Sequence, residues 1–393
     1  MPQNQINSLL RFVIFQHPEP QAYFIETHWA RKPILVAALC AMAACEGCTG
    51  HTHAANSNVS IDSQLSDCNR ATCNLKIPAG SFSFSTEVNP SAIIQIEGSG
   101  ASYDNPGFPT TAAFPFVEAH CITTLIWTGG NRPPFLFNNY HAQGSKLSSF
   151  CLNAVGTSPP VFIDVDNFAG DIQLNDIVID KPTVKAEIAA IRYGNESVVV
   201  GPKCADVFVR AAAPIGFDVL NVQAHFMGER CRAVWNDENE WLIGDSTHVT
   251  ESFHCHLCTA EARPGNIPVV IRNVLGFSWT ESYTEGLIAF DIPSDAVNAQ
   301  QVSISNSFAS SGQNSGVAAF VRTALPTATL MLSGNEILGA TPSYIVEDDS
   351  LARATIIGNT MPSAMVAKNG NKVCALGNAA TSSLAKPAAG VCN

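Results

Sequence analysis

Charged residues are scarce in this chain. They make up 14% of its 393 residues, against roughly 25% in an ordinary soluble domain. The 21 basic and 33 acidic residues give a net charge of −12, which argues against a nucleic-acid surface because such surfaces need clustered Lys and Arg. No uncharged apolar stretch reaches about 18 residues, which excludes a bundle of membrane-spanning helices. The hydrophobic fraction of 46% excludes general disorder.

Several signature motifs are also missing. The sequence contains no phosphate-binding loop, no dinucleotide-binding fingerprint and no Gly-x-Ser-x-Gly nucleophile elbow. The dipeptides Asn-Gly and Asp-Gly, which mark tight β-hairpins, occur only at Asn369-Gly370. These absences argue against nucleotide-dependent chemistry and against a sandwich built from hairpins.

Residues 1–45 are predicted to be an export signal. A positive flank precedes an eleven-residue apolar stretch, 34–44, which is too short for a comfortable membrane span. Its end resembles a bacterial lipobox, in which Cys45 would become the lipidated first residue of the mature protein. Ordinary secretion and an uncleaved anchor are the alternatives. With 46–60 as a flexible tether, we expect an exported protein, either a lipoprotein of the outer membrane and cell surface or a secreted one.

The body of the chain, 61–370, consists of short apolar runs separated by Gly, Asn, Asp, Ser and Pro, as in strands and turns. One unit recurs with starts at 287, 317 and 344, at separations of 30 and 27. A repeat of this size indicates stacked supersecondary units. The sequence therefore predicts an all-β parallel solenoid of one domain, followed by a tail at 371–393. Asn306, Asn335 and Asn359 end the units and are predicted to form a ladder at one corner.

These units, with the early segments 77–82 and 123–129, resemble the right-handed parallel β-helix proteins of the pectate-lyase-like superfamily. The resemblance covers roughly 61–370. It implies a right-handed parallel β-helix that is a polysaccharide lyase, glycoside hydrolase, epimerase or esterase, or else a non-catalytic surface protein. The polygalacturonase motifs Asn-Thr-Asp, Gly-His-Gly and Arg-Ile-Lys are absent, which argues against hydrolysis of galacturonan.

The cysteine count agrees with export. Ten cysteines follow the signal and tether region, and an even number in an exported chain suggests disulfides. Two of the pairs that neighbour pairing gives, Cys121–Cys151 and Cys204–Cys231, have the repeat's own separations. They would staple adjacent coils, since a residue one turn onward is expected directly above its starting point. The other pairs would be Cys68–Cys73, Cys255–Cys258 and Cys374–Cys392.

Cys255 and Cys258 form a Cys-x-x-Cys segment with flanking histidines. Soft ligands at this spacing occur in zinc sites, but a structural site needs four converging ligands. A tight disulfide, a metal site and two free thiols all remain open for this pair.

Acidic and aromatic residues concentrate in one third of the chain. Of the 33 acidic residues, 20 lie between Asp164 and Asp295, together with three tryptophans. Sugars stack on aromatic rings, and carboxylates bind their hydroxyls or transfer protons. We therefore predict a groove that hydrolyses an extracellular polysaccharide with two carboxyl groups about 5–9.5 Å apart. The candidate catalytic residues are Asp237, Glu281 and Glu285, and the candidate substrate-binding residues are Trp235, Trp241, Trp279 and Glu240.

Two other functions remain open. The resemblance implies that a polysaccharide lyase would use Lys or Arg as its base, helped by Ca²⁺, but no Lys occurs between Lys203 and Lys368. A non-catalytic adhesion protein would use the same groove only to bind glycans. No other cofactor is predicted, and the expected partner is a polysaccharide, with membrane contact only through a lipid anchor. The oxygen ligands for Ca²⁺ would be Asp164, Asp166, Asp176 and Asp180.

Overall fold

A computed structural model of the chain describes residues 59–103, 119–310, 319–338, 344–348, 353–361 and 373–380. The chain divides into two compact units, Met1–Ala54 and Ala55–Asn393, and every described residue belongs to the second. The predicted export signal, with Cys45, lies outside the described residues. Neither described helix has the length and apolar character needed to cross a membrane.

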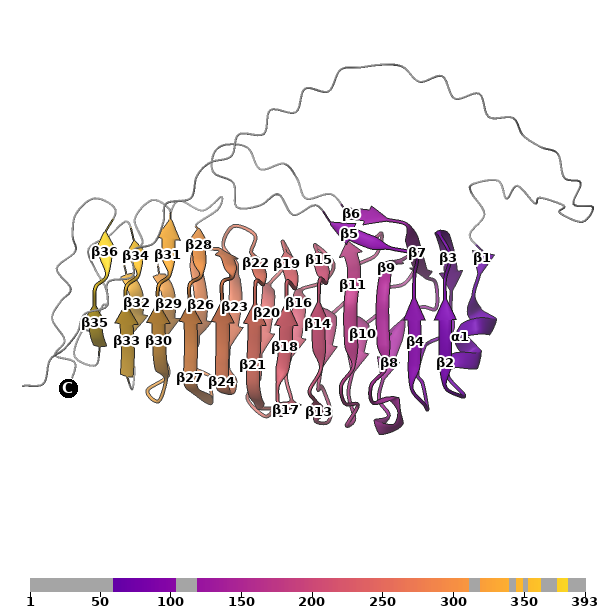
Figure 1. The fold of residues 1–393 in the computed structure, drawn as a ribbon, viewed down its shortest axis with the longest axis horizontal. Helices are drawn as coiled ribbons and strands as arrows, with labels where there is room; N and C mark the ends of the chain where they lie inside the picture. Colours follow the sequence, from indigo (N-terminus) through magenta and orange to yellow (C-terminus); the bar gives the residue numbers. More distant parts are fainter. Residues whose placement is uncertain are drawn as a thin grey trace, which may run out of the picture. The chain divides into compact units, whose positions relative to one another are not determined.

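The second unit is a parallel β-solenoid, as the repeats predicted (Figure 1). A typical coil passes through three strand segments. The first two belong to a 23-stranded sheet, in which we distinguish a main row from a strip that follows it around a corner, and the third belongs to a nine-stranded sheet. The strands β9 and β11 run through both the main row and the strip.

The main row comprises β2 (Cys73–Lys76), β4 (Ile94–Glu97), β9 (Lys146–Ala154), β11 (Gln173–Asp180), β14 (Lys203–Ala205), β18 (Phe226–Glu229), β21 (Thr250–His256), β24 (Asn273–Thr280), β27 (Asn298–Ser305), β30 (Thr329–Ser333), β33 (Arg353–Ile357) and β35 (Val373–Leu376). The strip comprises β1 (Val59–Ser60), β3 (Gly80–Phe84), β7 (Thr123–Trp127), β15 (Phe208–Arg210), β19 (Arg232–Val234), β22 (Thr259–Glu261), β25 (Tyr283–Glu285), β28 (Phe308–Ser310), β31 (Glu336–Leu338), β34 (Thr360–Met361) and β36 (Ala379–Ala380).

The nine-stranded sheet comprises β8 (Phe135–Phe137), β10 (Val161–Val165), β12 (Ala189–Tyr193), β16 (Ile215–Val219), β20 (Asn239–Ile243), β23 (Ile267–Ile271), β26 (Ile288–Ile292), β29 (Ala319–Thr323) and β32 (Tyr344–Asp348). The remaining elements are the parallel pair β13 (Val199–Val200) and β17 (Val222–Gln223), the antiparallel pair β5 (Ala101–Tyr103) and β6 (Ala119–Cys121), the helix α1 (Asp62–Cys68) and the 3₁₀ turn η1 (Tyr140–Ala142).

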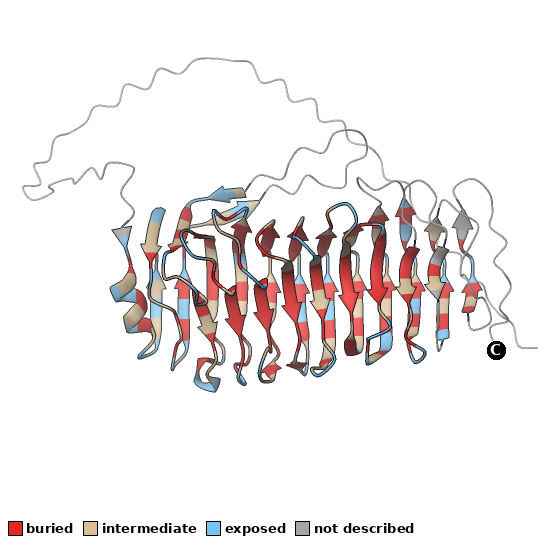
Figure 2. Ribbon diagram, turned by 180° about the vertical axis from the view of Figure 1, so that it is seen from behind, coloured by how far each residue is buried: buried red, intermediate tan, exposed pale blue. Residues whose placement is uncertain are grey.

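The interior is a stack of identical or similar side chains. Phe226, Phe253 and Phe277 occupy one position on successive coils, with ring centroids 5.0 and 5.1 Å apart and planes within 4°. Parallel strands lie about 4.8 Å apart, so in-register aromatic rings are held close to stacking distance. Buried residues accordingly follow the strands along the stack (Figure 2).

The corner between the main row and the strip uses a residue with positive φ on each coil. Asp206, Arg230, Leu257, Glu281 and Asn306 take this conformation at φ near +50°, and glycines replace them on the last coils. The short strand of the strip begins two residues after it, because the left-handed conformation turns the chain sharply.

An amide ladder lies one residue beyond that corner. Asn335 Nδ2 donates to Asn359 Oδ1 at 2.8 Å, and Asn359 Nδ2 donates to Asn378 Oδ1 at 3.0 Å. The predicted ladder is thus confirmed for Asn335 and Asn359 and corrected for Asn306, which lies at the corner itself. Ser307 takes the ladder position on that coil, and its backbone N–H donates to Asn335 Oδ1.

The coils are less regular than the repeats predicted. Ile288 pairs with Ala319, and Ala319 pairs with Tyr344, so these coils begin at 288, 319 and 344 instead of the predicted 287, 317 and 344. Loops between strands absorb such differences while the strand register stays fixed. The solenoid also continues past 370, because β35 and β36 pair with β33 and β34.

Both predicted inter-coil disulfides are present. Cys121–Cys151 and Cys204–Cys231 have Cα separations of 5.6 and 6.3 Å, within the usual disulfide range. The predicted register behind them was wrong, since the residue that pairs with Cys204 is Gly228. In each bridge, one cysteine lies three residues from the position that pairs with the other. Cys231 follows Gly228 by three residues, and Cys121 precedes Thr124, the residue that pairs with Cys151, by three residues.

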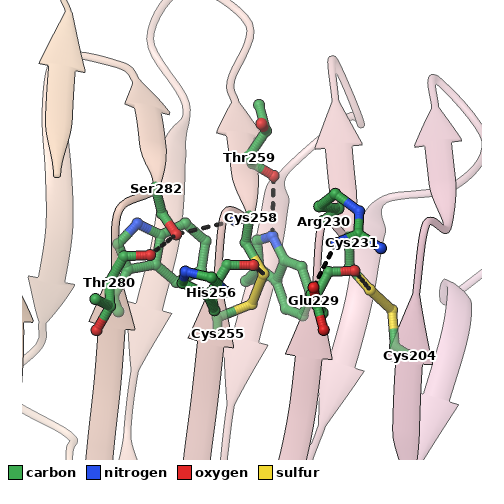
Figure 3. Close-up of a disulfide and its surroundings, with 12 residues drawn as sticks. Cys204, Glu229, Arg230, Cys231, Cys255, His256, Cys258, Thr259, Thr280 and Ser282 are labelled. Carbon is green, nitrogen blue, oxygen red and sulfur yellow. Dashed lines mark hydrogen bonds and ion pairs between the residues drawn. A yellow bond between two sulfur atoms is a disulfide. The ribbon is translucent and has the colours of Figure 1, made fainter. Parts of the chain in front are cut away.

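Two further disulfides link neighbours in the sequence. They are Cys68–Cys73 and Cys255–Cys258, so the Cys-x-x-Cys segment is closed by a bond between its own sulfurs. Figure 3 shows the latter beside the bridge from Cys204 to Cys231. Cys392, the last cysteine of the predicted pairing, lies outside the described residues.

Candidate active site

Two of the predicted substrate-binding tryptophans lie in the core. Trp241 and Trp279 have no exposed surface. Trp241 stacks on Phe217 with centroids 4.1 Å apart and meets Trp279 edge-on at 5.9 Å. A ring without accessible surface cannot stack on a sugar, so this expectation is corrected for both. Trp235 remains half-exposed at the corner after β19.

Glu240 also lies inside the solenoid. Its side chain is 1% exposed, and Oε1 accepts the backbone N–H of Asn236 at 3.0 Å. Burial raises the pKa of Glu240 to about 8, although the hydrogen bonds from Asn236 oppose this shift. This carboxyl closes a corner of the core and has no access to a bound polysaccharide.

Asp237 and Glu281 are not brought together. Asp237 forms ion pairs with Lys185 at 2.7 Å and Arg263 at 3.0 Å, beyond the end of β19. Glu281 occupies the opposite corner, ahead of β25, with His256 as its partner at 3.4 Å. Two coils separate β19 from β25, a rise of about 9.6 Å, and the three-residue strand adds roughly 10 Å along the chain. Their separation thus exceeds the range of a catalytic carboxylate pair.

A different pair of carboxylates meets on the strip. Glu261 and Glu285 occupy the same position on consecutive strands, β22 and β25. Strand residues alternate between faces, so the middle residues Ala260 and Thr284 are buried inward while both carboxyls lie on the outer face. Adjacent strands place their Cα atoms about 4.8 Å apart, close to the carboxyl separation of about 5–5.5 Å in retaining glycosidases.

Both carboxyls are shielded from water although they lie on an outer face. The side chain of Glu261 is 19% exposed, and Glu285 is 8% exposed. Burial raises the pKa of Glu261 to about 7, against the opposing charge of Arg232, and the charge of Glu285 raises it further. Burial also raises the pKa of Glu285, while a hydrogen bond from Tyr283 opposes that shift. A matched pair of carboxyls with raised pKa values is typical of acid–base sites.

The two acids have different partners. Tyr283 Oη donates to Glu285 Oε2 at 2.6 Å, which stabilises the ionised form of Glu285. The guanidinium of Arg232 lies 3.4 Å from Glu261 Oε1. One carboxyl therefore has a neutral donor and the other a more distant cation, so the site holds two acids in unequal environments.

Aromatic rings flank the pair on the same face, and the residues Tyr103, Tyr283 and Phe308 among them are half-buried. Tyr283 stacks on Phe308 of the next coil with centroids 5.5 Å apart. On the other side, Tyr103 of the β5–β6 hairpin stacks on Phe208 at 4.9 Å, and the guanidinium carbon of Arg232 lies 5.2 Å from the Tyr103 ring centroid. Aromatic surface next to carboxylates suits the apolar face and the hydroxyls of a sugar.

Of the predicted catalytic residues, the structure places Glu285 in this pair, while Glu261 was missed. The sequence did contain a signal for it. Thr259-Ala260-Glu261 and Tyr283-Thr284-Glu285 are similar triplets, and the structure pairs them residue by residue on consecutive coils. Trp235 lies beside Glu261 on the neighbouring coil, since its backbone N–H donates to the carbonyl oxygen of Glu261 at 2.7 Å.

The four aspartates considered for Ca²⁺ are not gathered into one site. Both oxygens of Asp164 bind Arg192, and both oxygens of Asp180 bind Arg210. Asp166 accepts backbone N–H groups of Asn167, Glu196 and Ser197, whereas Asp176 lies at the corner within β11. Within the described ranges, no group of three or more His, Cys, Asp or Glu side chains is placed to hold a metal ion.

No protein-family model matches this chain, and no curated protein matches it. Among solved structures, it is similar to one described as ORF18 of Geobacillus virus E2, with 12% sequence identity and a TM-score of 0.39. The similarity covers 72% of this chain and 51% of that chain, so this chain matches about half the length of the viral protein. Similarity at this level says nothing about function.

Proposed function

We propose that this chain hydrolyses an extracellular polysaccharide on the strip, with Glu261 and Glu285 as the catalytic carboxyls. The in-register position of these two acids on β22 and β25 is the observation that carries the proposal. The resemblance of the repeats to pectate-lyase-like β-helix proteins supports a polysaccharide as substrate. Export, by the predicted signal and with or without a lipid at Cys45, would bring the enzyme to such a substrate.

Glu261 would act as the general acid. A pKa of about 7 keeps much of this carboxyl protonated at neutral pH, so it can protonate the leaving glycosidic oxygen. Glu285, with Tyr283 donating to it, would attack the anomeric carbon and form a glycosyl-enzyme intermediate. Water would then hydrolyse this intermediate with Glu261 acting as base, and the configuration of the sugar would be retained.

The properties of the arginines argue against the lyase alternative. A lyase base must lose a proton before it can abstract one from the substrate. Burial opposes the shift, but hydrogen bonds from Arg192 to Asp164 and from Arg230 to Asp206 raise the pKa of both guanidiniums, so both keep their protons and neither is available as a free base. An arginine paired in this way serves better to position a carboxylate than to remove a proton.

The test uses the purified chain with a panel of neutral and acidic polysaccharides and measures released reducing ends. Glu261→Gln and Glu285→Gln should each reduce the rate by about 10²–10⁴-fold, because each removes a group that transfers a proton or forms the covalent bond. Glu281→Gln is the matched control, since this exposed acid lies outside the strip, at the corner ahead of β25 with His256 as its partner, and it should leave the rate unchanged. Circular dichroism would establish that all variants are folded.

Three outcomes would overturn the proposal. Undiminished hydrolysis by both Gln variants would remove the pair from the reaction. Tight binding of a polysaccharide with no released ends by the unmodified chain would instead assign the strip to a non-catalytic adhesion protein. Inversion of the anomeric configuration, followed by NMR, would contradict the nucleophilic role of Glu285.

A further inference from the structure

A second polar site lies away from the strip. It is a groove of about 370 Å³ at the nine-stranded sheet, bordered by β8, β10, β12 and the loops that flank them. This volume falls within the range of small-molecule sites. Neither Glu261 nor Glu285 lines the groove, so the proposed reaction does not account for it.

The charged part of the groove is held rigidly. Asp164 and Arg192 occupy the same position on neighbouring strands and form two hydrogen bonds of 3.1 and 2.7 Å. Both residues are buried. Asp166 accepts the backbone N–H groups of Glu196 and Ser197 at 2.9 and 2.8 Å, which fixes the loop that forms one wall. A fixed site loses little conformational entropy when a ligand binds.

Two amide side chains in the groove are available to a ligand. Asn138 and Asn195 line the groove and are partly exposed. Among the described residues, neither side chain makes a hydrogen bond. An amide offers two donors and an acceptor, which matches the hydroxyl groups of a sugar.

The remaining lining determines which ligand fits. Pro133, Leu136 and Pro160 supply apolar surface that can pack against the C–H face of a sugar ring. The lining contains three carboxylates and one guanidinium, a net charge of −2. Like charges repel in a partly buried site, so an acidic sugar such as a uronate is disfavoured.

We infer that this groove binds a neutral sugar unit of the polysaccharide, as a binding site separate from the acid pair on the strip. The choice of a polysaccharide as the source of that sugar rests on the proposed function. The site would hold the chain on its substrate between cleavage events, and it would select neutral stretches over acidic ones.

The test measures binding to the full chain carrying Glu285→Gln, so that the probes are not consumed. The probes are short oligomers of neutral hexoses and of N-acetylhexosamines, with oligogalacturonate as the acidic comparison. At least one neutral oligomer should bind, and oligogalacturonate should bind more weakly. Adding Asn138→Ala with Asn195→Ala should weaken neutral binding by about 10-fold or more, which corresponds to one or two lost hydrogen bonds. Asn131→Ala, an exposed position on the preceding loop that is not part of the lining, should change nothing.

Tighter binding of oligogalacturonate, unchanged neutral binding in the double Asn variant, or no neutral binding at millimolar concentration would each overturn the inference. Failure of the proposed hydrolysis is distinguishable, because it is read from released reducing ends with Glu261→Gln and Glu285→Gln. Suppose that the double Asn variant loses binding while the Gln variants still hydrolyse the polysaccharide at the full rate. The groove would then be supported as a sugar-binding site, and Glu261 and Glu285 would be rejected as the catalytic pair.

Discussion

Gly228 pairs with Cys204 on the neighbouring coil, yet the sulfur of Cys204 is bonded to that of Cys231, which lies three residues after Gly228. On the next coil the same column holds Cys255, which is bonded to Cys258. Gly228 thus lies between two disulfides. A Cβ at this position would approach Cys255 Sγ to 2.8 Å, a distance that real Cβ atoms essentially never show.

Gly228→Ala should therefore destabilise the solenoid by about 1–3 kcal/mol, because the added methyl group overpacks the column between the two bridges. Chemical denaturation with both disulfides intact would measure this change. The matched control is Gly276→Ala, whose Cβ would meet its nearest neighbour at 3.7 Å, an ordinary contact. Equal stabilities for the two variants would mean that the space between the two disulfides accommodates the added methyl group without strain.

Asn359→Leu should cost about 3 kcal/mol, because leucine would leave several buried groups without partners, and this costs more than the hydrogen bonds themselves contribute. Asn359 has no exposed surface, and its amide donates to Asn378 Oδ1 and Leu332 O while its oxygen accepts the backbone N–H of Asn335. Asn306→Gly, at the exposed corner with φ of 48°, should stay within about 0.5 kcal/mol of the parent. Thermal unfolding of both variants compares the two positions, and similar losses would mean that the ladder does not stabilise the last coils.

Stability should fall as the pH rises, in part because of Glu240. Its pKa is about 8 in the folded chain and near 4.5 when unfolded, so the folded state binds the proton more tightly. The stabilisation is complete below the unfolded pKa and is lost as the pH rises through about 8. Between pH 6 and 9 this single group should remove about 2–3 kcal/mol. Glu240→Gln, which keeps the acceptor for Asn236, should flatten the profile in urea denaturation. If the slope of stability against pH stays the same in this variant, groups other than Glu240 cause the pH dependence.

The rate of hydrolysis should follow a bell-shaped pH profile. Glu261 must be protonated to act as the acid, so the rate should decline as the pH rises through about 7. Glu285 must be ionised to attack, and because its pKa is raised, the acidic limb should begin above the usual range of a carboxyl. Initial rates across the pH range would show both limbs. A rate that stays constant from pH 6 to 9 would contradict the assignment of Glu261.

The solenoid could be predicted from the sequence because the stack repeats its pattern on every coil. Apolar runs and following asparagines recur at nearly constant spacing, and the structure places these runs as stacked strands. The predicted disulfides were correct even though the register behind them was not, since a bond of this kind tolerates a Cα separation anywhere in a range of about 2 Å. The fold is thus robust to errors of a few residues.

The candidate site is not robust to such errors. Trp235 and Trp279 look alike in sequence because each precedes an acid by two residues, but the step between them is not a whole number of coils. Val234 pairs with Glu261 and Glu261 pairs with Glu285, so the residue two coils above Trp235 is Gly286 and not Trp279. One side chain therefore lies at a corner and the other points into the core. Loops of unequal length hide this difference from any pattern read at a fixed repeat.

The fixed register and the variable loops also determine how this chain can change length. More residues separate Ile288 from its partner Ala319 than separate Phe253 from its partner Phe277. Each of these strands nevertheless pairs in parallel with the equivalent strand of the next coil. An insertion in a connecting loop leaves all inward side chains in place, whereas a single residue added to a three-residue strand of the strip would exchange its inner and outer faces. Loops can therefore gain or lose residues and reshape the surface around the acid pair, while the strip itself tolerates substitution but not changes in length.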